Sequence, residues 1–523
     1  MGRCVIPMQI SSNEISTPAA SATARWCISF GVISVVLAAC AVGPAFKQPT
    51  PDAPAAWSSW HGGDASLQEP AIRGNQAPVP ERWWETFDDA TLNALEIRAG
   101  TANLDLRTAA LHFAQSRAQR QTVAAQRGPQ LSGKASANRN RESEHDSSGR
   151  LLGAVAPAQS SQLEQVLGIP YNLYQVGFDA SWELDLWGRV RRAVEAADAD
   201  VTASAAALEG VRIDIAAEVA RNYFELRGAQ KQLQLARTDL AAVENILELI
   251  QARAVGGVTS DLDATRQRAL VADLRAHLPA LLDQEAQTLN QLSLLLGEHP
   301  GALQTELKSG ADTFAARGLP DLALGLPSEL ARRRPDIRQA EARLHSATAS
   351  IGIAVADLYP RITLKGSFGF EAISAGNLAD WNSRTWTLGP SLDIPIFDMG
   401  RRRSVVTLRK LQEQEAAVAY QRTVLTAWHE IDTALSGYTS ERQRNEQLAE
   451  QEKESRIAYD LARSLYEGGS ASFLDELDAQ RSMLSAQRDF ADSNSQLAIR
   501  LVAIYKALGG GVLGDDSAPR MPL

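Results

Sequence analysis

The sequence is poor in cysteine and histidine, and it lacks the short motifs that most catalytic sites carry. Its 523 residues contain three cysteines and seven histidines, and no spacing matches a Cys-x-x-Cys or a mixed His/Cys metal site. No P-loop, dinucleotide-binding, HExxH or GxSxG pattern occurs. Acidic residues outnumber basic ones by 62 to 52, so there is no basic footprint for nucleic acid. We therefore expect no enzyme, no catalytic residues, no metal and no nucleic-acid partner.

Long hydrophobic runs are also missing beyond the N-terminal region. No later stretch reaches the roughly 18 apolar residues that indicate a spanning helix. Within a bilayer every backbone polar group must be hydrogen-bonded by the protein itself, which leaves helices and closed β-barrels as spanning structures. If this chain crosses a membrane, it therefore does so as a barrel.

Residues 1–39 have the features of a secretory signal peptide. Arg25 precedes an apolar run, 26–39, which ends in the small residues typical of a cleavage point. The ending, Leu-Ala-Ala followed by Cys40, resembles a bacterial lipobox. This resemblance implies cleavage before Cys40 and attachment of N-acyl diglyceride and palmitate to it, and Ala41 in place of an aspartate favours the outer membrane. The alternative is an ordinary signal peptide followed by a chance cysteine.

The rest of the chain repeats itself. GFDASWELDLWGR at 177–189 matches GPSLDIPIFDMGR at 389–401 with an offset of 212 residues. Further upstream, DLRTAALHFAQ at 105–115 matches DIRQAEARLHS at 336–346 with an offset of 231. The difference between the two offsets is an insertion in the first half. Each half then follows the order helix, β-hairpin, long helix, turn, helix, which indicates a gene duplication.

Alternating polar and apolar residues predict four strands in two β-hairpins, at 130–187 and 361–397. In the first hairpin, apolar residues from Tyr174 to Leu186 alternate with polar ones. In the second, the apolar residues include Ile362, Leu364, Phe368 and Phe370, followed by Trp386, Leu388, Leu392, Ile394 and Ile396. A soluble β-sandwich would show the same alternation, but four strands cannot close a barrel that needs about eight. Since open edges are forbidden in lipid, the chain is expected to pool strands with copies of itself.

Two helices are predicted to be much longer than those of a globular domain. From residue 189 to 255, apolar residues recur about every 3.6 positions, and 401–467 repeats the pattern. Sixty-seven residues correspond to roughly 100 Å of helix. Glycine-rich turns at 256–261 and 468–472 follow, so each long helix forms a helical hairpin with the next. Taken alone, these helices also fit an antiparallel coiled-coil scaffold without a pore.

Short motifs along nearly the whole mature chain carry a family resemblance. The chain resembles the outer membrane efflux proteins, the TolC-like and OprM-like exit ducts of tripartite pumps, and in particular their NodT-type lipoprotein branch. The matching residues are Val42-Gly43-Pro44 after the lipobox, Trp83-Trp84 with Phe87 and Leu92, Leu184 to Arg189, Arg334-Pro335-Asp336-Ile337, Pro360, Pro395 to Asp398 with Gly400-Arg401, and Leu474-Asp475.

The resemblance implies a mainly α fold with membrane β structure. Three chains would combine four strands each into a twelve-stranded transmembrane barrel, and their helices would form a periplasmic α-barrel. The implied partners are the homotrimer itself, outer-membrane lipid, a periplasmic adaptor and an inner-membrane RND-type pump. The expected segments are the signal peptide 1–39, a lipidated N-terminal and equatorial region 40–100, the first repeat 101–296, an equatorial linker 297–327, the second repeat 328–508 and a tail 509–523.

The resemblance also implies a gate at the helix turns. In relatives, inward-coiled helix tips close the periplasmic end, and the acidic residues of that aperture correspond here to Asp475 and Asp478. Tyr466 corresponds to a constricting tyrosine, and Asp263 is the equivalent acid of the first half. Ala471 stands where some relatives carry a linking arginine. Three copies of an acid around a narrow pore would favour cations, whereas the alternative role of Asp475 is to cap its helix.

A second hypothesis assigns the turns to adaptor binding. The residues concerned are Gly256, Gly257, Thr259, Gly468, Gly469 and Ser470. For the whole protein, the leading interpretation is a passive exit duct for small toxic compounds or drugs. The alternatives are an exit duct for type I protein secretion and a non-channel scaffold such as an adaptor, although no lipoyl-like domain lies between the helices.

Overall fold

The computed structural model describes residues 41–50, 60–68, 79–143, 168–308 and 333–510. The predicted signal peptide, Cys40, most of the linker and nearly all of the tail lie outside the described residues. The chain divides into two compact units. The first includes Gln126–Ala193 and Gly352–Val406, and the second contains the other described residues from Ala45 onward.

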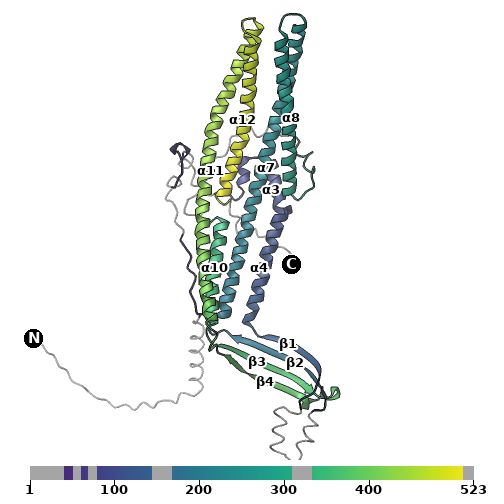
Figure 1. Ribbon diagram of the computed structural model, residues 1–523, viewed down its shortest axis with the longest axis vertical. Helices are drawn as coiled ribbons and strands as arrows, with labels where there is room; N and C mark the ends of the chain where they lie inside the picture. Colours follow the sequence, from purple (N-terminus) through teal and green to yellow (C-terminus); the bar gives the residue numbers. More distant parts are fainter. Residues whose placement is uncertain (1–40, 51–59, 69–78, 144–167, 309–332, 511–523) are drawn as a thin grey trace, which may run out of the picture. The chain divides into compact units, whose positions relative to one another are not determined.

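The first unit contains a four-stranded antiparallel sheet (Figure 1). Its strands lie side by side in chain order, and each pairs with the next. They are β1 (Gln130–Asn140), β2 (Tyr171–Leu184), β3 (Arg361–Ala372) and β4 (Arg384–Asp393).

Side chains alternate between the two faces of this sheet, as expected for extended strands. Phe178 lies opposite Phe368, and Trp182 lies opposite Leu364, so large apolar residues share one face. Several of these residues are exposed, including Phe178 at 59% and Trp386 at 70%. Within the described residues, these exposed side chains form an apolar surface of the kind that marks contact with a protein, a membrane or a ligand.

Two strands end earlier than their alternation predicted. β2 ends at Leu184 rather than continuing through Leu186, because the Asp185 carboxylate turns to accept backbone N–H groups at the start of the next helix. β4 ends at Asp393, so Ile394 and Ile396 lie beyond the strand. Proline 395 follows directly, and it cannot donate a backbone hydrogen bond to a neighbouring strand.

The helices of the two halves have corresponding bounds. The 67-residue helices α7 (Arg189–Val255) and α11 (Arg401–Glu467) start and end at the predicted residues. Each is followed by a 35-residue helix, α8 (Asp261–Leu295) or α12 (Phe473–Ala507). The first β-hairpin is preceded by α3 (Ala90–Ala102) and α4 (Leu104–Ala124), and the second is preceded by α10 (Pro335–Ala356). The described structure is thus mainly helical, and it includes no helix with both the length and the apolar character needed to span a bilayer.

The main core of the second unit joins helices to the segments expected near the equator. Trp83 stacks on Tyr505 with ring centroids 5.2 Å apart, and Phe87 packs on Phe224 at 4.8 Å. Leu303, from the start of the predicted linker, is buried in the same cluster. Aromatic side chains of this size contribute large buried areas, so they tie these segments firmly to the helices.

Candidate functional site

Two short turns join α7 to α8 and α11 to α12 (Figure 1). Gly257 and Gly469 have φ of +71° and +74°, a left-handed conformation that glycine adopts at low cost. After each glycine, the next N–H donates to the carbonyl five residues earlier, at 2.9 Å in the first turn and 2.8 Å in the second. Both turns are therefore Schellman caps, which satisfy the last carbonyls of the long helices.

Serine side chains begin the helices that follow the turns. The hydroxyl oxygens of Ser260 and Ser472 accept the N–H groups of Asp263 and Asp475, each at 3.3 Å. In the second turn the bond is reciprocated, because the Ser472 N–H donates to the Asp475 carboxylate at 2.9 Å. This capping box satisfies two backbone donors at the helix start.

The four predicted gate residues lie near these turns, in different settings. Asp475 is exposed, and hydrogen bonds from Ser472 lower the pKa of its carboxyl. Asp478 is exposed one helical turn later, on the same side of α12. The Asp263 carboxylate accepts hydrogen bonds from the Ser260 and Thr259 hydroxyls at 2.8 and 3.1 Å. Each aspartate at a cap therefore has a structural role in addition to any role as a charge.

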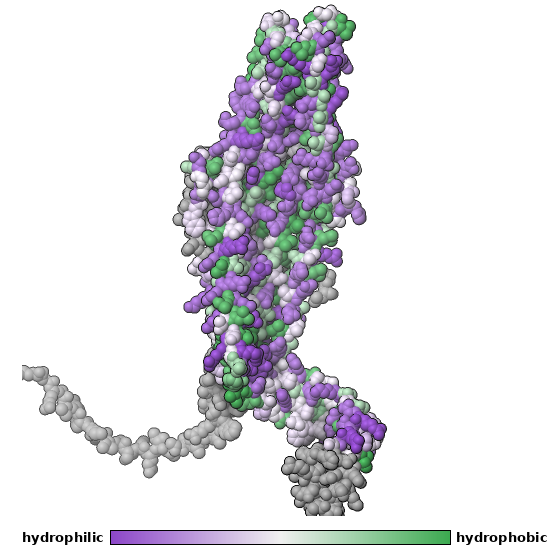
Figure 2. Space-filling view, in the orientation of Figure 1, coloured by the Kyte–Doolittle hydropathy of each residue, from purple (hydrophilic) through white to green (hydrophobic). Residues whose placement is uncertain are grey.

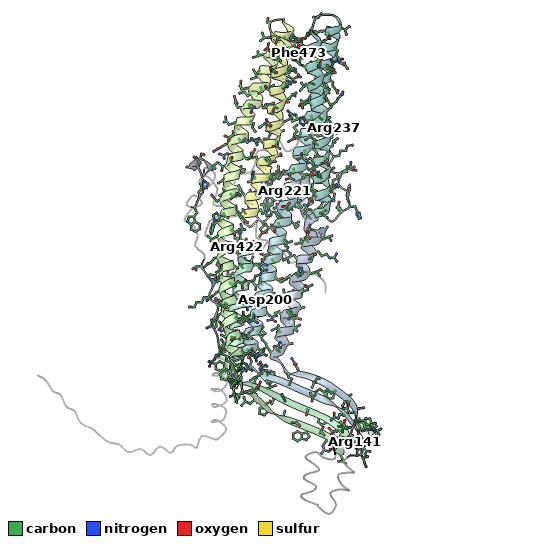
Figure 3. The ribbon with its side chains drawn as sticks, in the orientation of Figure 1. Arg141, Asp200, Arg221, Arg237, Arg422 and Phe473 are labelled. Carbon is green, nitrogen blue, oxygen red and sulfur yellow. The ribbon has the colours of Figure 1, made fainter. Side chains whose placement is uncertain are left out.

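Tyr466 connects three helix ends. Its ring lies 5.6 Å from that of Phe473 at the start of α12, and the guanidinium of Arg253 on α7 lies over it, also 5.6 Å from the centroid. Phe473 is buried near the tip, where Figure 3 labels it. The tyrosine is half-buried. In the single chain it thus packs between helix ends rather than standing free.

Glu476 is a tip residue that the sequence analysis did not select. Its side chain is buried, on the same side of α12 as Phe473 and Leu477. Burial raises the pKa of the Glu476 carboxyl, and Glu467 raises it further, while Arg463 and Arg253 act in the opposite direction. Its position within the apolar periodicity of α12 was the signal that could have revealed its burial.

The surface of the turns is exposed and partly hydrophobic. Val255 is 92% exposed and Val258 is 77% exposed. Four turn glycines and Ser470 are exposed, whereas Thr259 is half-buried. Figure 2 shows hydrophobic side chains at this end of the helices. Val255 and Val258 thus place exposed apolar surface beside the turn glycines.

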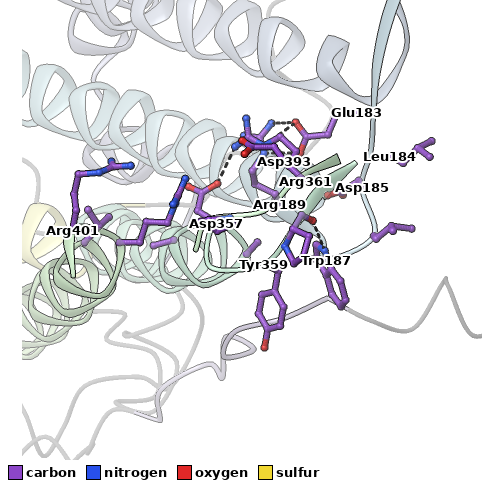
Figure 4. A pocket seen from close by; sticks show the side chains of 17 residues that line it. Glu183, Leu184, Asp185, Trp187, Arg189, Asp357, Tyr359, Arg361, Asp393 and Arg401 are labelled. Carbon is purple, nitrogen blue, oxygen red and sulfur yellow. Dashed lines mark hydrogen bonds and ion pairs between the residues drawn. The ribbon is translucent and has the colours of Figure 1, made fainter. Parts of the chain in front are cut away.

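A second candidate site lies within the first unit, where β2 ends and α7 begins (Figure 4). It is a cavity of about 290 Å³ with an acidic and basic lining. Arg189 donates two hydrogen bonds to the Glu183 carboxylate, both at 2.8 Å, and Arg361 donates to Asp357 at 3.1 Å. The first pair joins the start of α7 to the end of β2, and the second joins the start of β3 to the residue that follows α10. Across the described ranges, no cluster of three or more His, Cys, Asp or Glu residues could hold a metal ion.

Comparison with known proteins gives consistent matches over most of the chain. The family described as "Outer membrane efflux protein" matches residues 98–298 and 326–510. Outer membrane protein OprJ of Pseudomonas aeruginosa is 36% identical over 489 residues, which is 92% of this chain and 96% of OprJ. The pyoverdine export outer membrane protein OpmQ of Pseudomonas putida is 32% identical over 455 residues, 86% of this chain and 93% of OpmQ. A solved structure of the outer-membrane channel OprN gives a TM-score of 0.78 at 33% identity, covering 90% of this chain and 99% of that one.

Proposed function

The chain belongs to the outer membrane efflux protein family, and on this premise we propose that it is the exit duct of a tripartite efflux pump. It is an outer-membrane efflux protein, in a family of channels rather than enzymes. The observation that carries the proposal is that one chain has both a four-stranded sheet with exposed apolar side chains and two long helical hairpins. Small toxic compounds would pass through it from a periplasmic adaptor and an inner-membrane RND-type pump to the outside.

The pore itself is proposed to need three chains. One chain supplies four strands among its described residues, and both edges of that sheet are open. Three copies would give twelve strands, which is enough to close a barrel with polar side chains toward a water-filled lumen. The exposed Phe178 and Trp386 would then face lipid.

The lipid anchor at Cys40 is a further part of the proposal. Two residues later, the Val42 N–H donates to the Trp187 carbonyl at 3.1 Å, just beyond the end of β2. Gly43 lies so close to Gly352 that a Cβ on Gly43 would be 2.5 Å from the Cα of Gly352. The chain is therefore held at the strand ends directly after Cys40, which suits acyl chains that enter the same membrane as the strands.

The helix turns are proposed to serve as the gate and as the adaptor-binding surface. In a trimer, three copies of Asp475 and Asp478 would concentrate negative potential at a narrow opening. Tyr466 and Asp263 would line the same end. The exposed apolar turn residues Val255 and Val258 support adaptor docking around Gly256, Gly257, Thr259, Gly468, Gly469 and Ser470.

Deletion of the gene, followed by a broad toxicity screen, tests this function. We expect sensitivity to several unrelated small compounds to rise at least severalfold, and wild-type protein to restore tolerance. A Cys40→Ala version at equal abundance in the outer membrane would separate anchoring from conduction. Unchanged tolerance to every compound, together with loss of a secreted protein, would contradict the proposal.

A further inference from the structure

A cavity lies in the second unit where α7, α11 and α12 meet (Figure 1), and none of its lining residues belongs to the helix turns. Its volume is about 280 Å³, just below the roughly 300–1,000 Å³ of most ligand pockets, so it suits a small molecule. A Cβ on Gly228 of α7 would lie 2.7 Å from the Ser495 Oγ on α12, so these two helices are in close contact at one end of the lining. Because α7 belongs to the first repeat and α11 and α12 belong to the second, a ligand here would contact both repeats.

The lining of this cavity carries more positive than negative charge. Among the described lining residues, Arg227, Lys231 and Arg456 are basic and Glu452 is acidic. The Arg456 guanidinium donates two hydrogen bonds to the Glu452 carboxylate, so these two charges compensate each other. Arg227 and Lys231 therefore give the wall a net positive charge, which favours an anionic ligand.

Arg227 is buried and held in place by neutral groups on several sides. Its Nη1 atom donates to the Gln230 side-chain oxygen at 2.9 Å and to the Leu307 carbonyl at 3.3 Å. The guanidinium also lies over the Tyr223 ring, 5.0 Å from its centroid. A planar donor group that is already fixed loses little conformational entropy when it binds a carboxylate. Arg227 is thus suited to recognise an anionic head group.

The remaining lining combines apolar surface with a polar acceptor. Phe490 and Ala491 of α12 and Leu235 of α7 supply the apolar part. The Oε1 atom of Gln487, one helical turn before Ala491, is buried and accepts no hydrogen bond from any described residue. A buried acceptor that lacks a donor is unfavourable, so a ligand hydroxyl group that donates to it would be stabilising.

We propose that this cavity binds a small aromatic carboxylate that also carries a hydroxyl group. Arg227 and Lys231 hold the carboxylate. The aromatic ring packs on Phe490, and the hydroxyl group donates to Gln487. A ligand bound only by the folded protein stabilises it by mass action, so occupancy strengthens the packing of α7 against α12. The site goes beyond the proposed function, because it needs no passage of the ligand through a pore.

Isothermal titration of the full-length protein in an uncharged detergent tests the site with two probes that share one ring and one hydroxyl group. They are para-hydroxyphenylacetate, which is an anion, and tyramine, which has an ammonium group in place of the carboxylate. We expect saturable binding of the anion and at least tenfold weaker binding of the cation, because like charges repel. Amide hydrogen exchange of residues 227–235 and 487–495 should slow with the anion. Equal binding of both probes, or no saturable binding, would overturn the site and leave the efflux proposal standing, since tolerance to toxic compounds is measured separately.

Three variants assign the binding to this cavity. Lys231→Gln should weaken binding of para-hydroxyphenylacetate roughly tenfold, because it removes a charged hydrogen-bond donor. Lys410→Gln, an exposed lysine of α11 outside the lining, is the matched control and should bind as wild type does. Wild type should prefer para-hydroxyphenylacetate to phenylacetate, which lacks the hydroxyl group, and Gln487→Leu should lose this preference. Wild-type affinity in Lys231→Gln, or an equal loss in Lys410→Gln, would overturn the proposal, and a retained preference in Gln487→Leu would overturn the placement of the hydroxyl group.

Discussion

At the scale of single residues, the two helix turns use similar side chains in slightly different ways. Ser472 and Asp475 form a reciprocal capping box, whereas Asp263 accepts hydrogen bonds from two hydroxyl groups. Asp475 nevertheless remains exposed. A carboxylate can therefore cap its helix with one oxygen and still contribute charge to an opening. Asp478 can contribute charge but cannot cap the helix, because it lies a full turn into α12.

Substituting the two aspartates separately should distinguish these roles. Asp475→Ala should destabilise the start of α12, because it removes the N3 side of the capping box. Asp478→Ala should leave stability unchanged. The double variant, with Asp475→Ala and Asp478→Ala, should have reduced cation selectivity. The measurement is the reversal potential of the purified protein in a planar bilayer under a salt gradient.

Ser472→Ala is the matched control, since it weakens the same cap without removing a charge. It should lower stability as Asp475→Ala does and leave the reversal potential unchanged. Wild-type selectivity in the double aspartate variant would reject the gate role.

Some of these residues could be predicted from the sequence and others could not. The glycine pairs followed by Ser260 and Ser472 are local signals, and the structure has the turns and caps there. The contact of Tyr466 with Arg253 could not be predicted, because it joins residues from different repeats that meet only when the helices pack. The burial of Glu476 could have been predicted, because this residue falls on the apolar side of α12 with Phe473 and Leu477.

At the scale of elements, helix bounds were easier to predict than strand bounds. The long helices are interrupted by neither proline nor a glycine pair until their turns, so composition marks their ends. Strand alternation, by contrast, continues past β2 and β4 into residues that no longer pair. β2 ends where the Asp185 carboxylate caps α7, and β4 ends just before Pro395, which has no backbone N–H to donate. Neither cause can be seen in the alternation of polar and apolar residues.

Packing between α11 and α12 at the tip should depend on pH through Glu476. Because the pKa of this buried carboxyl is raised above its usual 4.5, the folded tip favours the protonated form. The stabilising contribution is therefore complete below about pH 4.5 and is lost as the pH rises through the folded-state pKa. Amide hydrogen exchange of residues 459–480, corrected for intrinsic rates, should be slower at about pH 4 than at about pH 7.

Glu476→Gln should remove this difference by keeping the side chain neutral at both pH values. Glu467→Gln, an exposed acid at the end of α11, should retain most of it. Equal pH dependence in wild type and Glu476→Gln would show that burial of this carboxyl does not control the tip.

At the scale of the whole molecule, the single chain is incomplete in one respect. Among the described residues, its helices bury a hydrophobic core that is mostly aliphatic, whereas its sheet has exposed apolar side chains and two edge strands without a partner. The repeat offsets relate the two hairpins, because Lys134 lies opposite Gly177 in the first and Lys365 lies opposite Gly389 in the second. The expectation of further copies follows from the number of strands, whereas the expectation of three copies comes from the resemblance to the family.

The most direct test of this account is the mass of the protein particle after extraction in mild detergent, measured by native mass spectrometry. The account predicts a particle with three copies of the mature chain, because three sheets of four strands close into one wall. A folded particle containing a single copy would contradict it, since an isolated four-stranded sheet cannot satisfy its own edges in a membrane.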